Sequence, residues 1–112
     1  MVNPSLQSVA NYRRLETRQA LLHLQALLNR VVKIELNDYG SFFGCGFRGT
    51  LDQVEVVPGS DTAISVFLSE GGGFFLDFKV ADAFLVRAGA GPAWLEFRRH
   101  DGGPTIEVHP AT

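Results

Sequence analysis

The sequence predicts an α+β protein in which an N-terminal helix precedes a strongly bent antiparallel sheet, folded as a small barrel with an added C-terminal hairpin. Three observations support this prediction. Apolar residues recur with a helical period up to about residue 30 and with a period of two afterwards. No helix-length segment separates the later strands, which argues against a parallel sheet. The 12 glycines of the 112-residue chain gather in one strand and in the turns, where they favour curvature.

The first 30 residues are predicted to form the helix. Asn3 and Pro4 supply an N-cap and a first helical residue, and neither Gly nor further Pro follows before Asn29. One apolar stripe forms at helical spacing, but Arg13 and Thr17 fall in its middle. We therefore expect the helix to bend there, or its first turns to pack elsewhere. The stripe consists of Leu6, Val9, Ala10, Ala20, Leu21, Leu24, Leu27, Leu28 and Val31.

A second, weaker apolar group lies on the opposite side of this predicted helix. Two apolar faces on one helix indicate a partner, so we expect self-association of the chain. The alternative is a soluble helix with scattered exposed leucines, which are common on protein surfaces. The group consists of Tyr12, Leu15, Leu22 and Ala26, of which the first three are candidate oligomer contacts.

Five strands are expected between residues 31 and 87. Residues 31–37 alternate between apolar and charged side chains, as in a half-buried strand. The next strand contains Gly44, Gly46 and Gly49, which predict a strong bend. Its apolar parity changes after Leu51, which predicts a bulge near Asp52 and Gln53. The strands after the first span about residues 42–57, 62–68, 74–80 and 84–87.

A terminal hairpin follows at residues 93–109. Pairing across its turn would place Phe97 near Ile106 and Leu95 near Val108, which gives the hairpin one apolar face. The chain is short enough to be a single domain over residues 1–112. This domain is expected to consist of a helix (1–30), a five-stranded barrel (31–87) and the hairpin.

Composition and charge narrow the classes of function. Hydrophobic residues make up 46% of the chain and its net charge is −2, which argues against disorder. The sequence has no apolar run of ~18 residues and no signal peptide, so we expect no membrane partner. The single cysteine, Cys45, excludes an internal disulfide framework and indicates the cytoplasm.

Charge is distributed unevenly along the chain. Residues 1–33 carry five basic side chains and one acidic side chain, whereas the remaining residues carry five basic and eleven acidic ones. The basic segment is expected to stay solvated or to dock on the acidic body of its own or a neighbouring subunit. Nucleic-acid phosphates are the less favoured partner, because five charges in a whole segment do not form a dense patch.

The sequence contains no motif typical of catalysis or of cofactor binding. Gly-x-Ser-x-Gly, Walker and paired Cys/His patterns do not occur. His100 and His109 flank the terminal hairpin and could approach one another, but a turn and a C-terminus favour exposed polar residues. Cys45 is expected to be a buried, small apolar side chain. We therefore predict no catalytic residue, no metal ligand and no cofactor.

Adjacent phenylalanines occur twice, at Phe42–Phe43 and at Phe74–Phe75. Neighbouring side chains of a strand point to opposite faces, so one member of each pair is directed away from the barrel core. We expect the helix, the hairpin or another subunit to cover these rings. Phe75 is therefore a fourth candidate oligomer contact, and stacking on nucleic-acid bases is the alternative.

Two stretches resemble motifs of the Sm-like (LSm) family of small β-barrels, over about residues 20–87. Val32–Gly40 followed by Phe47–Asp52 looks like the first motif of the family, and Val80–Val86 resembles the second. The resemblance implies an SH3-like or Sm-like barrel, a ring of subunits joined by strand pairing, and single-stranded RNA bound near the pore. Asp52 and Lys79 are the positions to which an RNA-binding role can be transferred, because the Asn of the first motif and the Arg-Gly of the second have no counterpart here.

The sequence thus predicts a non-enzymatic, homo-oligomeric assembly or interaction module of Sm-like architecture. Its expected partner is a further copy of the same chain, and a ring of such copies is one form of this assembly. Two alternatives stay open. One is an RNA-binding Sm-like ring, and the other is a small-molecule-binding α+β roll, because a Phe-rich sheet can line a pocket.

Overall fold

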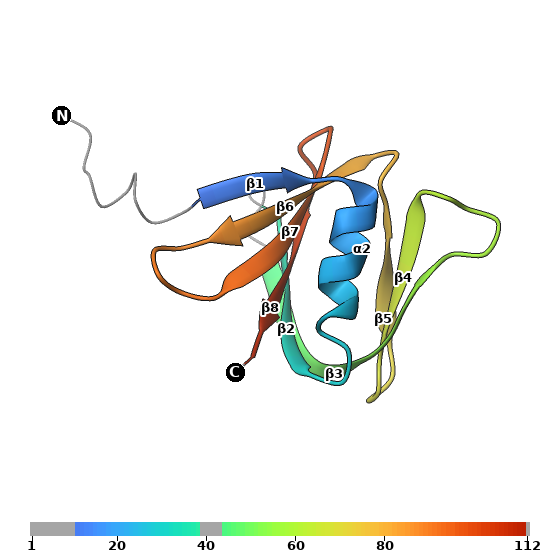
Figure 1. The fold of residues 1–112 in the computed structure, drawn as a ribbon, viewed down its shortest axis with the longest axis horizontal. Coiled ribbons are helices and arrows are strands. Elements are labelled where there is room, and N and C mark those ends of the chain that lie inside the picture. Colours follow the sequence, from blue (N-terminus) through green and yellow to red (C-terminus); the bar gives the residue numbers. More distant parts are fainter. Residues whose placement is uncertain (1–10, 39–43, 112) are drawn as a thin grey trace.

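The computed structural model describes residues 11–38 and 44–111, which form one helix and eight strands (Figure 1). The strands join a single antiparallel sheet in the order β1-β6-β7-β8-β2-β3-β4-β5. The elements are β1 (Asn11–Leu15), α2 (Thr17–Gln25), β2 (Val31–Asn37), β3 (Gly44–Val56), β4 (Ala63–Leu68), β5 (Gly73–Asp77), β6 (Ala81–Arg87), β7 (Ala93–Arg99) and β8 (Thr105–Pro110).

The sheet curls because β3 is kinked by a bulge. The register of β3 against β4 shifts between Leu51 and Gln53, and an extra residue on one strand bends that strand. The first part of β3 pairs with β2 and the second part pairs with β4. Asn29, in the left-handed conformation, donates its N–H to the carbonyl of Leu51 (2.7 Å) and so ties the end of the helical segment to this bend. The predicted bulge near Asp52 and Gln53 is confirmed.

The core lies between the helix and the curled sheet. In Figure 1, α2 is placed between the β6–β7–β8–β2 part of the sheet and the β4–β5 part. Ala20 and Leu24 of α2 are completely buried. They belong to one apolar cluster with residues of both parts of the sheet, among them Val32, Ile34, Leu51, Ile64, Val66, Leu95, Phe97 and Val108.

The prediction of a helix over residues 1–30 is wrong. Residues 11–15 form β1, which pairs with β6 from Asn11 opposite Arg87 to Leu15 opposite Ala83. The helix begins only at Thr17, after a capping box between Glu16 and Gln19. Backbone pairing with the edge of β6 outweighs the modest helix propensity of this stretch. The helix start expected at Asn3–Pro4 lies outside the described residues.

The predicted fold class, an α+β protein with a helix leading an SH3-like or Sm-like small barrel, is also wrong. The structure is mostly antiparallel sheet with one short helix, and the sheet is not closed, since β1 and β5 form its two edges. The reason is the position of the terminal hairpin. β8 pairs with β2 from Val32 opposite Pro110 to Asn37 opposite Thr105. It therefore occupies the edge of β2 that a five-stranded barrel would need for closure.

Most of the individual strands agree with their predictions. The strand at residues 31–37 has the predicted bounds, and the hairpin register of Leu95 with Val108 and of Phe97 with Ile106 is confirmed. Residues 81–83, which lie between the predicted strands at 74–80 and 84–87, are instead the start of β6. Cys45 is exposed, against the prediction that it is buried, because β3 leaves the core between residues 44 and 48.

α2 has nine residues, and no helix among the described residues is long and apolar enough to cross a membrane.

Candidate functional site

The free edge of β5 carries Phe75, the most exposed large hydrophobic residue among the described residues. Phe74 and Leu76 face the core, while Phe75 points away from it and is 70% exposed. Phe67 of β4 is exposed on the same face as Phe75. Its ring lies over Gly73, where an added Cβ would come within 3.1 Å of the ring and closer still to the backbone of Val66. The two phenylalanines therefore form an aromatic strip beside an edge strand.

The backbone of β5 is also available for pairing. Phe78 donates its N–H to the carbonyl of Thr62, and Leu68 donates to the carbonyl of Gly72 (3.0 Å each). Residues alternate between the two edges of an antiparallel strand, so the N–H and C=O groups of Gly73, Phe75 and Asp77 point away from β4. Of these groups, the carbonyl of Asp77 already accepts from the N–H of Val80 (3.2 Å). Natural edge strands are commonly protected by charges or proline. Here Asp77 is the only charged residue of β5.

The four predicted oligomer contacts are distributed over three elements. Phe75 lies on β5, Leu22 (57% exposed) on α2 and Tyr12 (56% exposed) on β1. Leu15 is only 5% exposed and belongs to the apolar core. Its burial leaves the other three residues available for a contact between subunits.

The two positions with a transferred RNA-binding role, Asp52 and Lys79, are both exposed but lie apart. Asp52 sits at the bulge of β3, beside the Leu68 end of β4. Lys79 follows β5, whose Asp77 is opposite Ala63 at the other end of β4. A strand of this length spans about 17 Å at ~3.3 Å per residue. The structure does not bring these two side chains together, and RNA binding stays a prediction.

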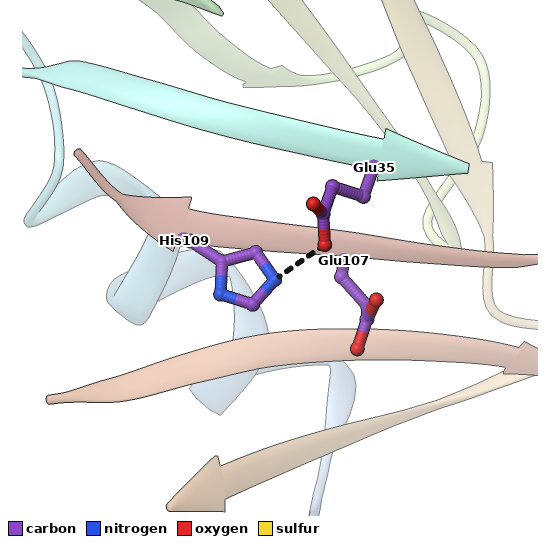
Figure 2. A group of neighbouring side chains, drawn as sticks. All are labelled: Glu35, Glu107 and His109. Carbon is purple, nitrogen blue, oxygen red and sulfur yellow. Dashed lines mark ion pairs between the residues drawn. The ribbon is translucent and has the colours of Figure 1, made fainter. Parts of the chain in front are cut away.

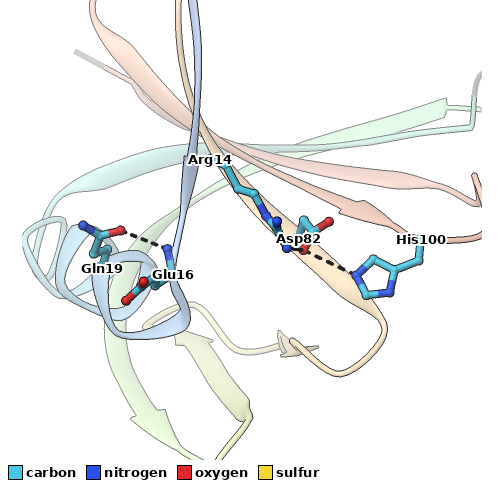
Figure 3. Close-up of polar contacts among 5 residues, drawn as sticks. All are labelled: Arg14, Glu16, Gln19, Asp82 and His100. Atoms are coloured by element: carbon cyan, nitrogen blue, oxygen red, sulfur yellow. Dashed lines mark hydrogen bonds and ion pairs between the residues drawn. The ribbon is translucent and has the colours of Figure 1, made fainter.

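A polar network fastens β1 to its neighbours (Figure 3). Arg14 forms an ion pair with Asp82 of β6 (Nη2–Oδ1, 2.7 Å), and His100 lies 3.4 Å from the same oxygen. The hydrogen bond from Arg14 holds the pKa of Asp82 below its ordinary value. The guanidinium of Arg98 lies 4.8 Å from the ring centre of Tyr12 and 4.7 Å from that of Phe84, within the range of cation–π contacts.

A second polar cluster lies on the face of the sheet opposite to α2 and consists of Glu35, Glu107 and His109 (Figure 2). Glu35 is directly opposite Glu107, because β2 and β8 pair in that register. His109 follows Glu107 by two residues and therefore shares its face. Its Nε2 lies 3.3 Å from Oε2 of Glu35. One carboxylate or imidazole atom from each residue lies within 4.8 Å of the other two, so this cluster could hold a metal ion.

The pKa values of the two carboxyl groups of the cluster are shifted in opposite directions. Burial raises the pKa of Glu107, and the carboxylates of Glu96 and Glu35 add to this effect. The pKa of Glu35 is lowered, first by a hydrogen bond from Lys33, whose Nζ lies 2.9 Å away.

Sequence reasoning did not find this cluster. The sequence indicates that His109 and His100 could approach one another, but these residues lie at opposite ends of the β7–β8 hairpin, and His100 contacts Asp82 instead. The alternation of Glu107 and His109 with Ile106 and Val108 does predict a shared face. The pairing of β8 with β2, which adds Glu35, joins segments some seventy residues apart and has no local signal.

Comparison with known proteins adds no assignment: no protein-family model, no curated protein and no solved structure matches this chain.

Proposed function

We propose that this protein is a non-enzymatic, homo-oligomeric interaction module that associates through the free edge of β5. The observation that supports the proposal is the 70% exposure of Phe75 at the centre of an edge strand whose only charged residue is Asp77, at its end. A lone cysteine agrees with a reducing compartment, and we place the module in the cytoplasm.

The sequence of β5 is self-complementary about Phe75. In an antiparallel pair of two β5 strands related by a two-fold axis, Phe75 is opposite Phe75 of the second copy. Gly73 is then opposite Asp77, and Phe74 is opposite Leu76. The outward-pointing N–H and C=O groups are opposed in this register, and the carbonyl of Asp77, which already accepts from Val80, would accept a second N–H. Like charges are not opposed. The core-facing side chains of the two copies also continue one another across the new pair. An isologous dimer is the expected assembly.

The experiment compares the wild-type chain with Phe75→Lys by multi-angle light scattering over a range of concentrations. A lysine at this position puts two like charges opposite each other in the dimer and should shift the protein to monomer. Leu22→Lys is the matched control, because Leu22 is a similarly exposed apolar residue on α2.

A wild-type protein that is monomeric at about 100 µM, a concentration at which weak assemblies of ~10 µM Kd would form, would contradict the proposal. Dissociation by Leu22→Lys with no effect of Phe75→Lys would also contradict it, and would place the interface on α2.

A further inference from the structure

Three glutamates form one row across neighbouring strands on the face of the sheet opposite to α2. Glu35 of β2 is directly opposite Glu107 of β8, which is directly opposite Glu96 of β7. Like charges in directly opposed positions destabilise a sheet, so each carboxylate of such a row requires a compensating group.

The outer two carboxylates of this row have cationic partners, whereas the central one has a neutral partner. Glu96 pairs with Arg98 (2.6 Å) and Glu35 pairs with Lys33 (2.9 Å). Glu107 accepts a hydrogen bond from the side-chain amide of Asn37 (Nδ2–Oε2, 2.6 Å). Within the described part of the chain, Glu107 forms no ion pair with Lys, Arg or His. The central carboxylate is therefore the position where a bound cation would remove most repulsion.

His109 presents a second unsatisfied group at the same place. Its Nε2 is buried and lies 3.3 Å from Oε2 of Glu35, but it makes no hydrogen bond among the described residues. The rings of His109 and Trp94 stack, with 5.0 Å between their centres and 25° between their planes. Buried polar atoms in folded proteins are normally satisfied, and a bound ion is one way to satisfy an imidazole nitrogen. The stack with Trp94 also fixes the orientation of the imidazole.

We propose that Glu35, Glu107 and His109 bind a divalent transition-metal ion. Two carboxylates neutralise its charge, and the imidazole favours an ion such as Zn²⁺ or Co²⁺ over Ca²⁺ and Mg²⁺, which prefer oxygen ligands. The site is supported by the middle of a sheet, since β8 is paired on both sides. Gly46, opposite Glu35 on β3, places no side chain beside that carboxylate.

Lys33 competes with the metal ion for Glu35. Its side chain is 46% exposed and that of Glu35 is 31% exposed. Ion pairs at such exposure contribute little to stability, so a metal ion can displace the ammonium group at small cost. Removing Lys33 should therefore tighten metal binding, which is opposite to the effect of removing a ligand.

The test uses the full chain, freed of metal with EDTA, and follows binding of ZnCl₂ by calorimetry and of CoCl₂ by fluorescence. Trp94 is the only tryptophan and stacks on His109, so its emission reports directly on the site. We expect one ion per chain. Glu107→Gln and His109→Gln should each weaken binding about tenfold or more, Lys33→Met should tighten it, and His100→Gln, which alters the separate pair with Asp82, should leave it unchanged.

Absence of saturable binding of both ions would overturn the proposal, as would undiminished binding by Glu107→Gln and His109→Gln. Equal or weaker binding by Lys33→Met would count against Glu35 as a ligand. The result is independent of self-association, because Phe75 is not a ligand. It lines a cavity with Leu36 and Ile106, whose side chains point to the opposite face of the sheet from Glu35 and Glu107. The variant Phe75→Lys should therefore bind metal as the wild type does.

Discussion

Glu35, Glu107 and Glu96 form one row of like charges, but their carboxylates have different hydrogen-bond and ion-pair partners. In metal-free protein, Glu107 is flanked by a carboxylate on each neighbouring strand and is bound by a neutral amide. We expect Glu107→Gln to raise the free energy of unfolding at pH 7 by about 0.2–1 kcal/mol, the range for relief of directly opposed like charges. Gln keeps the side-chain length and an oxygen that can accept from Asn37. Urea denaturation in EDTA measures the change.

Glu96→Gln is the matched control, with the opposite expected sign. The side chain of Glu96 is 7% exposed and pairs with Arg98 at 2.6 Å. Its loss should lower the free energy of unfolding by about 1–3 kcal/mol, because a charge-assisted hydrogen bond is removed in a poorly solvated place. Equal effects of the two substitutions would mean that the partners of each carboxylate do not determine its contribution to the free energy of unfolding.

At the scale of residues, the sequence predicts which side chains share one face of a strand better than it predicts which residues of other strands lie beside them. The alternation of Glu107 and His109 with Ile106 and Val108 is a local property, so their common face is readable. Their proximity to Glu35 depends on which strand pairs with β8. That choice is decided by non-local packing, and no turn or motif between the two segments encodes it.

At the scale of elements, β1 depends on a few polar contacts because only Leu15 of its side chains is buried. Arg14 lowers the pKa of Asp82, so the ion pair stabilises the folded state above the ordinary carboxyl pKa. This stabilisation is lost as the pH falls below about 4 and Asp82 becomes protonated. We expect the amides of β1 that bond to β6 to lose protection from hydrogen exchange in that pH range, before the amides of β2 and β8 do.

Asp82→Asn should produce the same loss of protection at pH 7 and should remove its dependence on pH. Asp101→Asn is the control, because Asp101 pairs with Arg99 within its own turn and does not touch β1. Exchange by NMR resolves the individual amides. Unchanged protection of residues 11–15 in Asp82→Asn would show that strand pairing with β6 suffices to hold β1.

The same element explains why the N-terminal prediction fails. The helical period of the apolar residues continues through α2, where Ala20 and Leu24 are completely buried. It is interrupted at Arg13 and Thr17, on either side of the junction at which β1 ends and α2 begins. Strands with period-two alternation, such as residues 31–37, are predicted well, because their pattern and burial agree. Residues 11–15 show neither period clearly, so pairing with β6 determines their structure.

At the scale of the whole molecule, the decisive difference from the predicted barrel is the place of β8. Its insertion beside β2 leaves the sheet open, with β1 and β5 as edges. The bend in β3 is readable from the change of parity after Leu51, where the register shifts. A bend alone does not determine closure, because closure requires that the first and last strands of the barrel remain free for one another.

An open sheet makes a specific prediction for hydrogen exchange in β5. In dilute protein, the amides of Phe74 and Leu76, which bond to β4, should exchange slowly, whereas those of Gly73, Phe75 and Asp77 should exchange rapidly. A closed barrel would protect both sets.

If two β5 strands pair, the fast set should become slow as the protein concentration rises, and Phe75→Lys should keep it fast at every concentration. Slow exchange of all five amides in dilute Phe75→Lys would mean that another strand of the same chain closes the sheet in solution. Alternating protection that does not depend on protein concentration would support the open sheet and contradict the dimer. The measurement therefore tests the fold and the assembly separately.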